Sequence, residues 1–335
     1  MRRSGLLLRS ALNRAVRDHF ETQGFVEVET ASLGVSPGNE AHLHGIAARV
    51  TTVDGRVAPL YLRTSPEFAC KGLLAAGERR IFELARVWRD RERGDLHAPE
   101  FTMLEWYRVE EPYERLMEDC ADLLRLTARL AGRDVFRFRG RQAEAAATPE
   151  RVTLAQAFDS FAGIDLLSSI GAGGETDRDD LRDRAQKVGV RTADNDTWSD
   201  IFSRVLVEKI EPHLGVGRPT LLCEYPACEA ALARLKPEDA RVAERFELYV
   251  CGVELANAFG ELTDPVEQRR RFEAEMAEKQ RVYGLDYPLD EGFLAALARM
   301  PPASGAALGF DRLAMLAAGV ERVSDVQWTS VPQTD

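Results

Sequence analysis

The stretch from residue 82 to residue 108 carries the side chains with the clearest chemical potential. It reads FELARVWRDRERGDLHAPEFTMLEWYR, so an apolar run ends at Arg89 and a charged loop containing His97 follows. A second apolar and aromatic run, residues 101–107, carries Glu105. This pattern predicts an antiparallel hairpin with a long polar loop. Arg89 would then project from the end of a rigid strand, where its planar guanidinium can grip a phosphate.

Three glutamates recur every seven residues in the last third of the chain, at Glu247, Glu254 and Glu261. The dipeptide Cys251-Gly252 can turn the chain between the first two. We therefore expect two adjacent antiparallel strands that carry Glu247 and Glu254. Two carboxylates in this arrangement are typical hard ligands for Mg²⁺, which keeps several waters and binds the phosphates of ATP.

The remaining pattern predicts the elements that position these side chains. We expect helices over 6–23, 66–76, 112–131, 265–283 and 292–300, and strands over 25–30, 41–53, 57–62, 220–225, 245–250 and 253–259. A strand of small residues then turns at Gly309 into a helix that opens with Asp311 and Arg312. The result is an α+β fold, with a mostly antiparallel sheet flanked by helices.

Two regions fall outside the predicted sheet. Residues from about 133 to 215 form a mostly helical insertion within a single domain spanning 1–335, and their first part, 133–149, is predicted to be an exposed connection. The helix over 265–283 is highly charged, and we expect four of its side chains to lie on the solvated surface: Gln268, Arg269, Arg270 and Lys279.

Composition narrows the class of protein. The chain has 335 residues, 45% of them apolar and 30% charged, as in an ordinary globular enzyme. A net charge of −11 argues against a partner that offers many phosphates, such as tRNA. The five cysteines are scattered and are expected to be reduced thiols. Because no apolar run reaches the roughly 20 residues of a membrane span, we expect no membrane association and a cytoplasmic enzyme.

Several ordered blocks together resemble the class II aminoacyl-tRNA synthetases, most closely the lysyl branch. The segment 82–108 resembles motif 2, and ALGFDRL at 306–312 resembles motif 3. GFVEVET at 24–30 resembles motif 1, and RTSPE at 63–67 resembles the amino-acid loop. RFE at 245–247 and GVELANAFGEL at 252–262 resemble the metal and substrate strands. The resemblance implies the class II synthetase catalytic fold over nearly the whole chain.

The resemblance also implies an ATP site with Mg²⁺. Arg89 and Arg312 are the expected catalytic residues: Arg89 contacts the α-phosphate, and Arg312 covers the face of adenine opposite Phe101. His97 would lie near the γ-phosphate, and Glu92 is the candidate to face the adenine amine. The full set expected to bind ATP is Arg89, Asp90, Arg91, Glu92, His97, Phe101, Glu254, Leu255, Gly309 and Arg312.

For the metal and the amino acid, the resemblance assigns further residues. Glu247 and Glu254 would hold the metal, and Glu261 would meet the side-chain amine of the substrate. An acid-rich pocket suits a dicationic amino acid, since ion pairing offsets the desolvation of each amine. Ala307 replaces the glycine found in enzymes that charge α-lysine, and one methyl group discriminates by about 1–3 kcal/mol. The expected substrate-binding residues are Ser65, Pro66, Glu67, Glu105, Tyr107, Asn257, Glu261 and Ala307.

No segment of this chain fits the N-terminal OB domain with which lysyl-tRNA synthetases bind the anticodon. The chain thus resembles the stand-alone paralogues that modify elongation factor P. These imply a homodimeric ligase that activates (R)-β-lysine, or lysine, as an adenylate and transfers it to a lysine ε-amine of elongation factor P. A truncated enzyme that aminoacylates tRNA, or a non-catalytic paralogue, is the alternative.

Three positions depart from the family pattern. Arg89-Asp-Arg-Glu92 replaces the frequent Arg-Asn-Glu, which brings in Arg91. Ala98 stands where His-Asn-Pro is usual, and Ala31 stands where motif 1 usually ends in Thr-Pro. None of these changes removes a charge that the expected chemistry requires.

Overall fold

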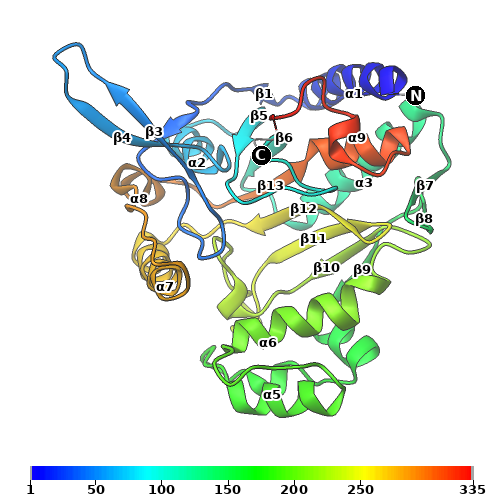
Figure 1. Ribbon diagram of the computed structural model, residues 1–335, viewed down its shortest axis with the longest axis vertical. Coiled ribbons are helices and arrows are strands. Elements are labelled where there is room, and N and C mark those ends of the chain that lie inside the picture. The colour runs from blue at the N-terminus through cyan, green and yellow to red at the C-terminus, as the bar shows by residue number, and fades with distance from the viewer. Residues whose placement is uncertain (1, 333–335) are drawn as a thin grey trace. The chain divides into compact units, whose positions relative to one another are not determined.

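The computed structural model describes residues 2–332, and its chain forms two compact units. The first unit combines the N-terminal segment up to Glu111 with the C-terminal segment from Thr263, and the second runs from Pro112 to Leu262. In Figure 1 the first unit is coloured blue to cyan and orange to red, and the second is green to yellow.

The first unit is built on four strands in the order β1-β5-β6-β13. Strands β5 (Arg80–Trp88) and β6 (Glu100–Val109) form the hairpin predicted from the sequence. Strand β13 (Ala303–Gly309) pairs antiparallel with β6, and the short β1 (Val26–Glu27) pairs parallel with β5. A separate sheet has the order β2-β4-β3, from β2 (Leu33–Gly34), β4 (Val57–Leu62) and β3 (Ile46–Thr51).

Helices of the first unit bury apolar stripes. The long α1 (Arg2–Thr22) buries Leu12, Val16 and Phe20, which are spaced by one helical turn. The Phe20 ring stacks on Phe82 of β5 with centroids 5.0 Å apart, so this helix packs on the sheet. The other helices are α2 (Glu67–Ala75), α7 (Pro265–Tyr283), α8 (Glu291–Leu297), α9 (Phe310–Ala318) and a 3₁₀ turn at Val323–Asp325.

The second unit has its own four strands in the order β12-β11-β10-β9. Strands β10 (Thr220–Cys223), β11 (Arg245–Val250) and β12 (Val253–Gly260) are antiparallel neighbours, and β9 (Glu150–Thr153) pairs parallel with β10. The long helix α3 (Glu114–Ala131) begins this unit. Figure 1 shows β10, β11 and β12 side by side in green to yellow.

The middle of the second unit is largely helical. It contains α4 (Leu154–Ala157), α5 (Arg178–Lys187), α6 (Trp198–Val205), π-helical turns at Phe158–Ala162 and Leu206–Ile210, and 3₁₀ turns at Leu167–Ser169, Glu211–His213 and Ala227–Glu229. The rings of Phe158 and Trp198 both stack on Phe202, with centroids 5.3 Å apart in each pair. These rings belong to a hydrophobic core that the helical part shares with Leu222 of β10 and Tyr249 of β11.

The structure corrects two predictions. Residues 133–149 are not an exposed connection, because they contain a hairpin of β7 (Val135–Phe138) and β8 (Arg141–Glu144), in which Phe136 and Ala143 are fully buried. Gln268 and Lys279 of α7 do not lie on the surface; both have no exposed area. Charge along a helix predicted a solvated face, whereas tertiary contacts bury these two side chains. The single domain spanning 1–335 stays a prediction.

Two properties of the whole described chain bear on its chemistry. None of the helices within residues 2–332 is long and apolar enough to cross a membrane. All five cysteines are free thiols, and only Cys228 is exposed. Burial raises the pKa of the Cys251 thiol to about 11, so this group carries a proton near neutral pH.

Candidate active site

Arg89 stands where the β5–β6 hairpin gives way to its loop. Its backbone N–H donates to the carbonyl of Pro99 at 3.0 Å, which extends the ladder one step beyond the two strands. The guanidinium carbon lies 5.4 Å from the centre of the Phe101 ring, and Nε donates to the carbonyl of Thr64 at 3.3 Å. The side chain is therefore oriented by a strand, a ring and a carbonyl, and Nη1 lies 3.8 Å from the Glu92 carboxylate.

His97 and Arg312 approach each other although 215 positions separate them. Nη2 of Arg312 lies 2.8 Å from Nε2 of His97, and Nε of Arg312 donates to the carbonyl of Leu96 at 3.2 Å. Burial lowers the pKa of His97, and the cation of Arg312 lowers it further. A neutral imidazole can accept the Arg312 hydrogen bond, so the two charges do not oppose each other.

The structure thus brings most of the expected ATP-binding residues of the first unit together. The charges of Arg312, Glu92 and Arg89 all act on His97, which places these groups around one loop. Arg91, at φ 64°, is held in the left-handed region. Asp90 donates its backbone N–H to the carbonyl of His44. Gly309, the residue just before α9, has φ −69°, so no left-handed backbone requires glycine there.

A second group of predicted residues surrounds Glu105 in the same unit. Glu105 is 1% exposed, and its carboxylate accepts hydrogen bonds from Ser65 Oγ at 2.5 Å and from Tyr107 OH at 2.7 Å. The Ser65 hydroxyl also accepts the backbone N–H of Glu67, at 3.0 Å, just after Pro66. Ala307 on β13 lies directly opposite Glu105 on β6, so its methyl group is a cross-strand neighbour of this carboxylate.

Glu105 carries an unusual protonation state. Burial raises its pKa to about 8, and the nearby Glu67 carboxylate adds to that rise, while the hydrogen bonds from Ser65 and Tyr107 oppose it. Glu67 itself pairs with Lys71 at 2.6 Å. A buried carboxyl with a strongly raised pKa is a candidate for a functional site. An ammonium placed beside it would favour its ionised form.

Two charged residues next to this group were missed by the sequence reasoning. Arg63 pairs with Glu83 at 2.8 Å, and both side chains are nearly buried. Glu83 lies directly opposite Glu105 on the neighbouring strand, so Arg63 neutralises the second carboxylate on that face. The RTSPE block contained the signal, since its first residue is an arginine that follows a strand. Lys71, in the second turn of α2, was missed as the partner of Glu67.

In the second unit, a β-bulge brings the expected metal ligands to one face. Glu247 pairs with Asn257 and Tyr249 pairs with Glu254, with a register shift between Leu248 and Tyr249. In a regular strand, residues 254 and 257 would point to opposite faces. The extra residue, Leu255, cancels this alternation. Glu247, Tyr249, Glu254 and Asn257 therefore share one face, and the predicted antiparallel strands are confirmed.

The partners of Glu247 include a residue that was not predicted to be functional. Arg245 pairs with Glu247 at 2.7 Å, and Tyr249 OH donates to the same carboxylate at 2.8 Å. The Arg245 guanidinium also lies 4.2 Å from the centre of the Tyr225 ring. The signal for Arg245 was its spacing from Glu247, since residues two apart on a strand share a face.

A third carboxyl feels the charges of Glu247 and Glu254. Burial raises the pKa of Glu211, and the charges of Glu247 and Glu254 add to that rise.

The set of oxygen donors decides which metal would fit. Within residues 2–332, no group of three or more histidine, cysteine or acidic side chains is arranged to hold a metal ion. Glu247 and Glu254 supply carboxylates alone, which suits Mg²⁺, because this ion keeps several waters and takes substrate phosphates as ligands. Glu261 lies beyond the end of β12 and is 2% exposed.

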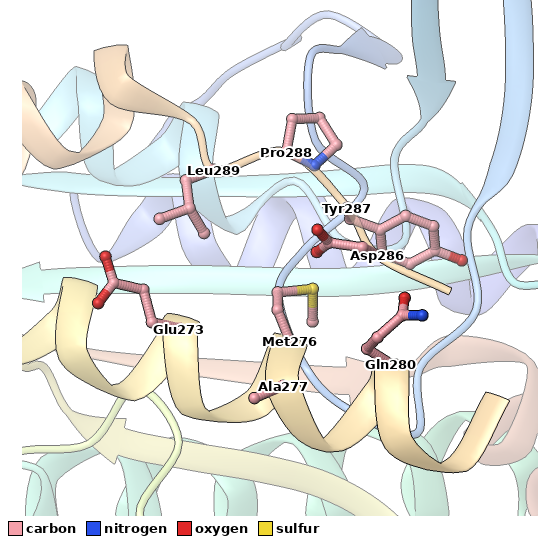
Figure 2. Close-up of a pocket in the computed structure, with 8 residues that line it drawn as sticks. All are labelled: Glu273, Met276, Ala277, Gln280, Asp286, Tyr287, Pro288 and Leu289. Atoms are coloured by element: carbon pink, nitrogen blue, oxygen red, sulfur yellow. The ribbon is translucent and has the colours of Figure 1, made fainter. Parts of the chain in front are cut away.

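A groove of about 450 Å³ lies elsewhere in the first unit, between α7 and residues 286–289. Figure 2 shows Glu273, Met276 and Gln280 on the helix, facing Tyr287 and Leu289. None of the predicted site residues lines this groove. It is therefore separate from the groups around Arg89 and Glu105.

An arginine at the end of a strand hairpin, with the loop histidine contacted by a second arginine from the helix after β13, is the arrangement of a class II synthetase catalytic fold. The chain matches the family model of class II tRNA synthetases (D, K and N) over residues 2–330, and it belongs to this family. Membership in this family implies the use of ATP.

Three similar relatives carry the same name. The chain is 40% identical to the elongation factor P–(R)-beta-lysine ligase of Proteus mirabilis over 327 residues, which cover 96% of this chain and 94% of the relative. The ligases of the same name from Edwardsiella ictaluri and Salmonella arizonae are 40% and 41% identical over 96% of this chain, and cover 94% and 93% of their own lengths.

Proposed function

We propose that this chain is an ATP-dependent ligase that joins (R)-β-lysine, or α-lysine less well, to a lysine side chain of elongation factor P. The observation that carries the proposal is 40% identity over nearly the full length to ligases with this name. The grouping of Arg89, His97 and Arg312 around one loop supports it, because a paralogue without catalytic activity would not need these charges together.

In the first step, a carboxylate oxygen of the amino acid attacks the α-phosphorus of ATP. The bond between the α-phosphorus and the bridging oxygen breaks, and pyrophosphate leaves. Arg89 would stabilise the charge on the α-phosphate, because its guanidinium is already oriented and needs no reorganisation. Phe101 and Arg312 would cover the two faces of adenine, with Glu92 at the adenine amine and His97 near the γ-phosphate.

The amino acid would be selected by the group around Glu105. A substrate ammonium would pair with Glu67 and with Glu105, which keeps its proton while the site is empty, partly because a second negative charge beside Glu67 is unfavourable. Ser65 and Tyr107 hold the Glu105 carboxylate in place by hydrogen bonds. Ala307, opposite Glu105, would shape the pocket for the β-isomer. Glu261 would meet the side-chain amine, with Asn257 as a further polar contact.

Mg²⁺ would be held by Glu247 and Glu254, on the face that the β-bulge creates. When bound, the ion would neutralise phosphate charge during the first step. Because Glu247 already pairs with Arg245 and Tyr249, its orientation is set without the metal.

In the second step, the ε-amine of one lysine of elongation factor P attacks the carbonyl carbon of the adenylate. An amide bond forms, the bond to AMP breaks, and the amine loses one proton. We propose that the enzyme acts in the cytoplasm as a homodimer and as a single catalytic domain.

Intact mass spectrometry of elongation factor P tests the proposal. The purified factor is incubated with this enzyme, Mg·ATP and (R)-β-lysine, beside an α-lysine reaction and an Arg89→Ala variant. The expected result is a gain of one lysyl unit on a single lysine, faster with the β-isomer and abolished by Arg89→Ala. Adenylate formation without any mass gain would keep the first step and refute elongation factor P as the acceptor.

A further inference from the structure

Lys279 is a fully buried lysine near the C-terminal end of α7, far along the chain from Arg89. Its ammonium donates to three backbone carbonyls: Glu40 at 3.1 Å, Ala41 at 2.8 Å and Leu43 at 2.6 Å. These carbonyls belong to one irregular stretch, residues 36–45, which we call the 36–45 segment. Three acceptors on one ammonium use all of its donors.

Other contacts of the same region hold the 36–45 segment against α7 and the residues after it. The Tyr287 and Tyr283 rings lie 4.8 Å and 5.8 Å from the Lys279 nitrogen, close enough for cation–π attraction. Glu275 on α7 accepts the N–H of Ala41 at 2.8 Å. The Tyr287 hydroxyl accepts the N–H of Gly45 at 3.0 Å. The segment therefore depends on side chains rather than on regular backbone pairing.

The 36–45 segment in turn contacts the backbone just after Arg89 and, through Thr64, the Arg89 side chain. The carbonyl of His44 accepts the N–H of Asp90, the residue after Arg89, at 2.8 Å. The carbonyl of Pro37 accepts the hydroxyl of Thr64. The carbonyl of Thr64 accepts Nε of Arg89 at 3.3 Å. A shift of this segment would thus move both the main chain and the side chain of Arg89.

We propose that Lys279 is a positioning residue for the nucleotide site, acting through the 36–45 segment to fix the orientation of Arg89. This inference rests on the proposed adenylation reaction, in which Arg89 binds the α-phosphate. Lys279 is not among the residues expected to contact the nucleotide. Its ammonium is required because a neutral amine has only two N–H groups and leaves one of the three carbonyls without its donor.

The protonation of Lys279 separates this role from a purely structural one. Burial lowers its pKa to about 8; Arg91 also lowers it, whereas Glu40 and Glu275 raise it. The unfolded chain keeps the ordinary lysine pKa, so it binds more protons than the folded chain between pH 8 and the usual value near 10.5. Loss of the Lys279 proton in this range therefore does not destabilise the fold.

His44 is a second titratable group close to Lys279. Burial lowers the pKa of His44, Lys279 and Arg91 lower it further, and Asp90 opposes them. His44 is therefore neutral throughout the range in which Lys279 titrates. Glu105 titrates in the same pH range as Lys279, so the assignment to the lysine depends on a variant that moves the Lys279 pKa.

The test is the dissociation constant of Mg·ATP, measured by titration calorimetry between pH 7.5 and pH 9 on the full chain. If binding requires the ammonium, affinity falls about fivefold from pH 8 to pH 9, the ratio of charged fractions for a pKa of about 8. The thermal midpoint should not fall in parallel. Glu275→Gln removes a carboxylate that raises the Lys279 pKa, so the same fall should move to lower pH.

Two further variants complete the test. Lys279→Met should bind Mg·ATP weakly at pH 7.5 and show no pH dependence up to pH 9. Gln280→Met, an exposed neighbour on α7, should keep the wild-type profile. Wild-type affinity that is constant from pH 7.5 to pH 9, or a Glu275→Gln profile that does not move, would overturn the role of Lys279, even if Lys279→Met fails to fold. Absence of Mg·ATP binding at every pH would overturn the adenylation proposal as well.

Discussion

Binding of lysine or β-lysine should expel a proton from Glu105. Burial raises the pKa of this carboxyl to about 8, and Glu67 adds to the rise. At pH 7 about nine tenths of such a group is protonated. A substrate ammonium favours the ionised form, so binding should release about 0.9 proton at pH 7 and about 0.1 proton at pH 9.

The affinity should follow the same titration. Below pH 8, each pH unit should tighten binding by up to tenfold, or about 1.4 kcal/mol, and the dependence should flatten above pH 8. Protein stability changes in the opposite direction. The folded protein binds more protons at Glu105 than the unfolded chain between the usual pKa of 4.5 and about 8, so this group lowers the free energy of unfolding as the pH rises.

Titration calorimetry at pH 7 in two buffers of different ionisation enthalpy measures the released proton directly. Glu105→Gln should abolish the release and weaken binding by about 2–5 kcal/mol, the cost of removing one partner of a buried charge pair. Glu67→Gln should lower the Glu105 pKa and so reduce the release at pH 7. Tight binding without proton release in the wild type, or unchanged release in Glu105→Gln, would refute the reasoning.

Two predictions concern the stability of the first unit. Arg9→Met should destabilise the protein by about 3–5 kcal/mol in urea denaturation, because it leaves buried Asp311 without its cation. Adding the Asp311→Leu substitution should restore much of the lost stability. A double variant as unstable as Arg9→Met would count against the buried-charge explanation. Gln268→Met should raise the free energy of unfolding by about 1–2 kcal/mol, because the buried Gln268 amide has no hydrogen-bond partner among residues 2–332. A lower urea midpoint for this variant would show that the amide is needed.

Local sequence pattern was sufficient to predict the β5–β6 hairpin. The apolar run that ends before Arg89 and the aromatic run that carries Glu105 form β5 and β6 at nearly the predicted bounds. The Cys251-Gly252 turn also lies where expected, with both residues at positive φ. These features depend on neighbours in the chain, so alternation and turn residues can predict them.

The register between strands could not be predicted from these local patterns. Alternation alone would place Glu254 and Asn257 on opposite faces, and only the bulge at Leu255 brings both to the face of Glu247. Pairing of Arg63 with Glu83 likewise follows from the approach of a loop to a strand. These arrangements depend on which strands meet and in what register.

The sequence by itself therefore determined the family of the chain, the order of most of its elements and the charged residues that its motifs contain. Tertiary structure alone decided the partners, the burial and the pKa values of those charged residues. The sequence predicts that Lys279 is an exposed lysine in a charged helix. In the structure its ammonium contacts three carbonyls and two aromatic rings. Burial of Glu105 and Lys279 moves both pKa values to about 8. Desolvation arises from everything packed around a group, so no local pattern reveals it.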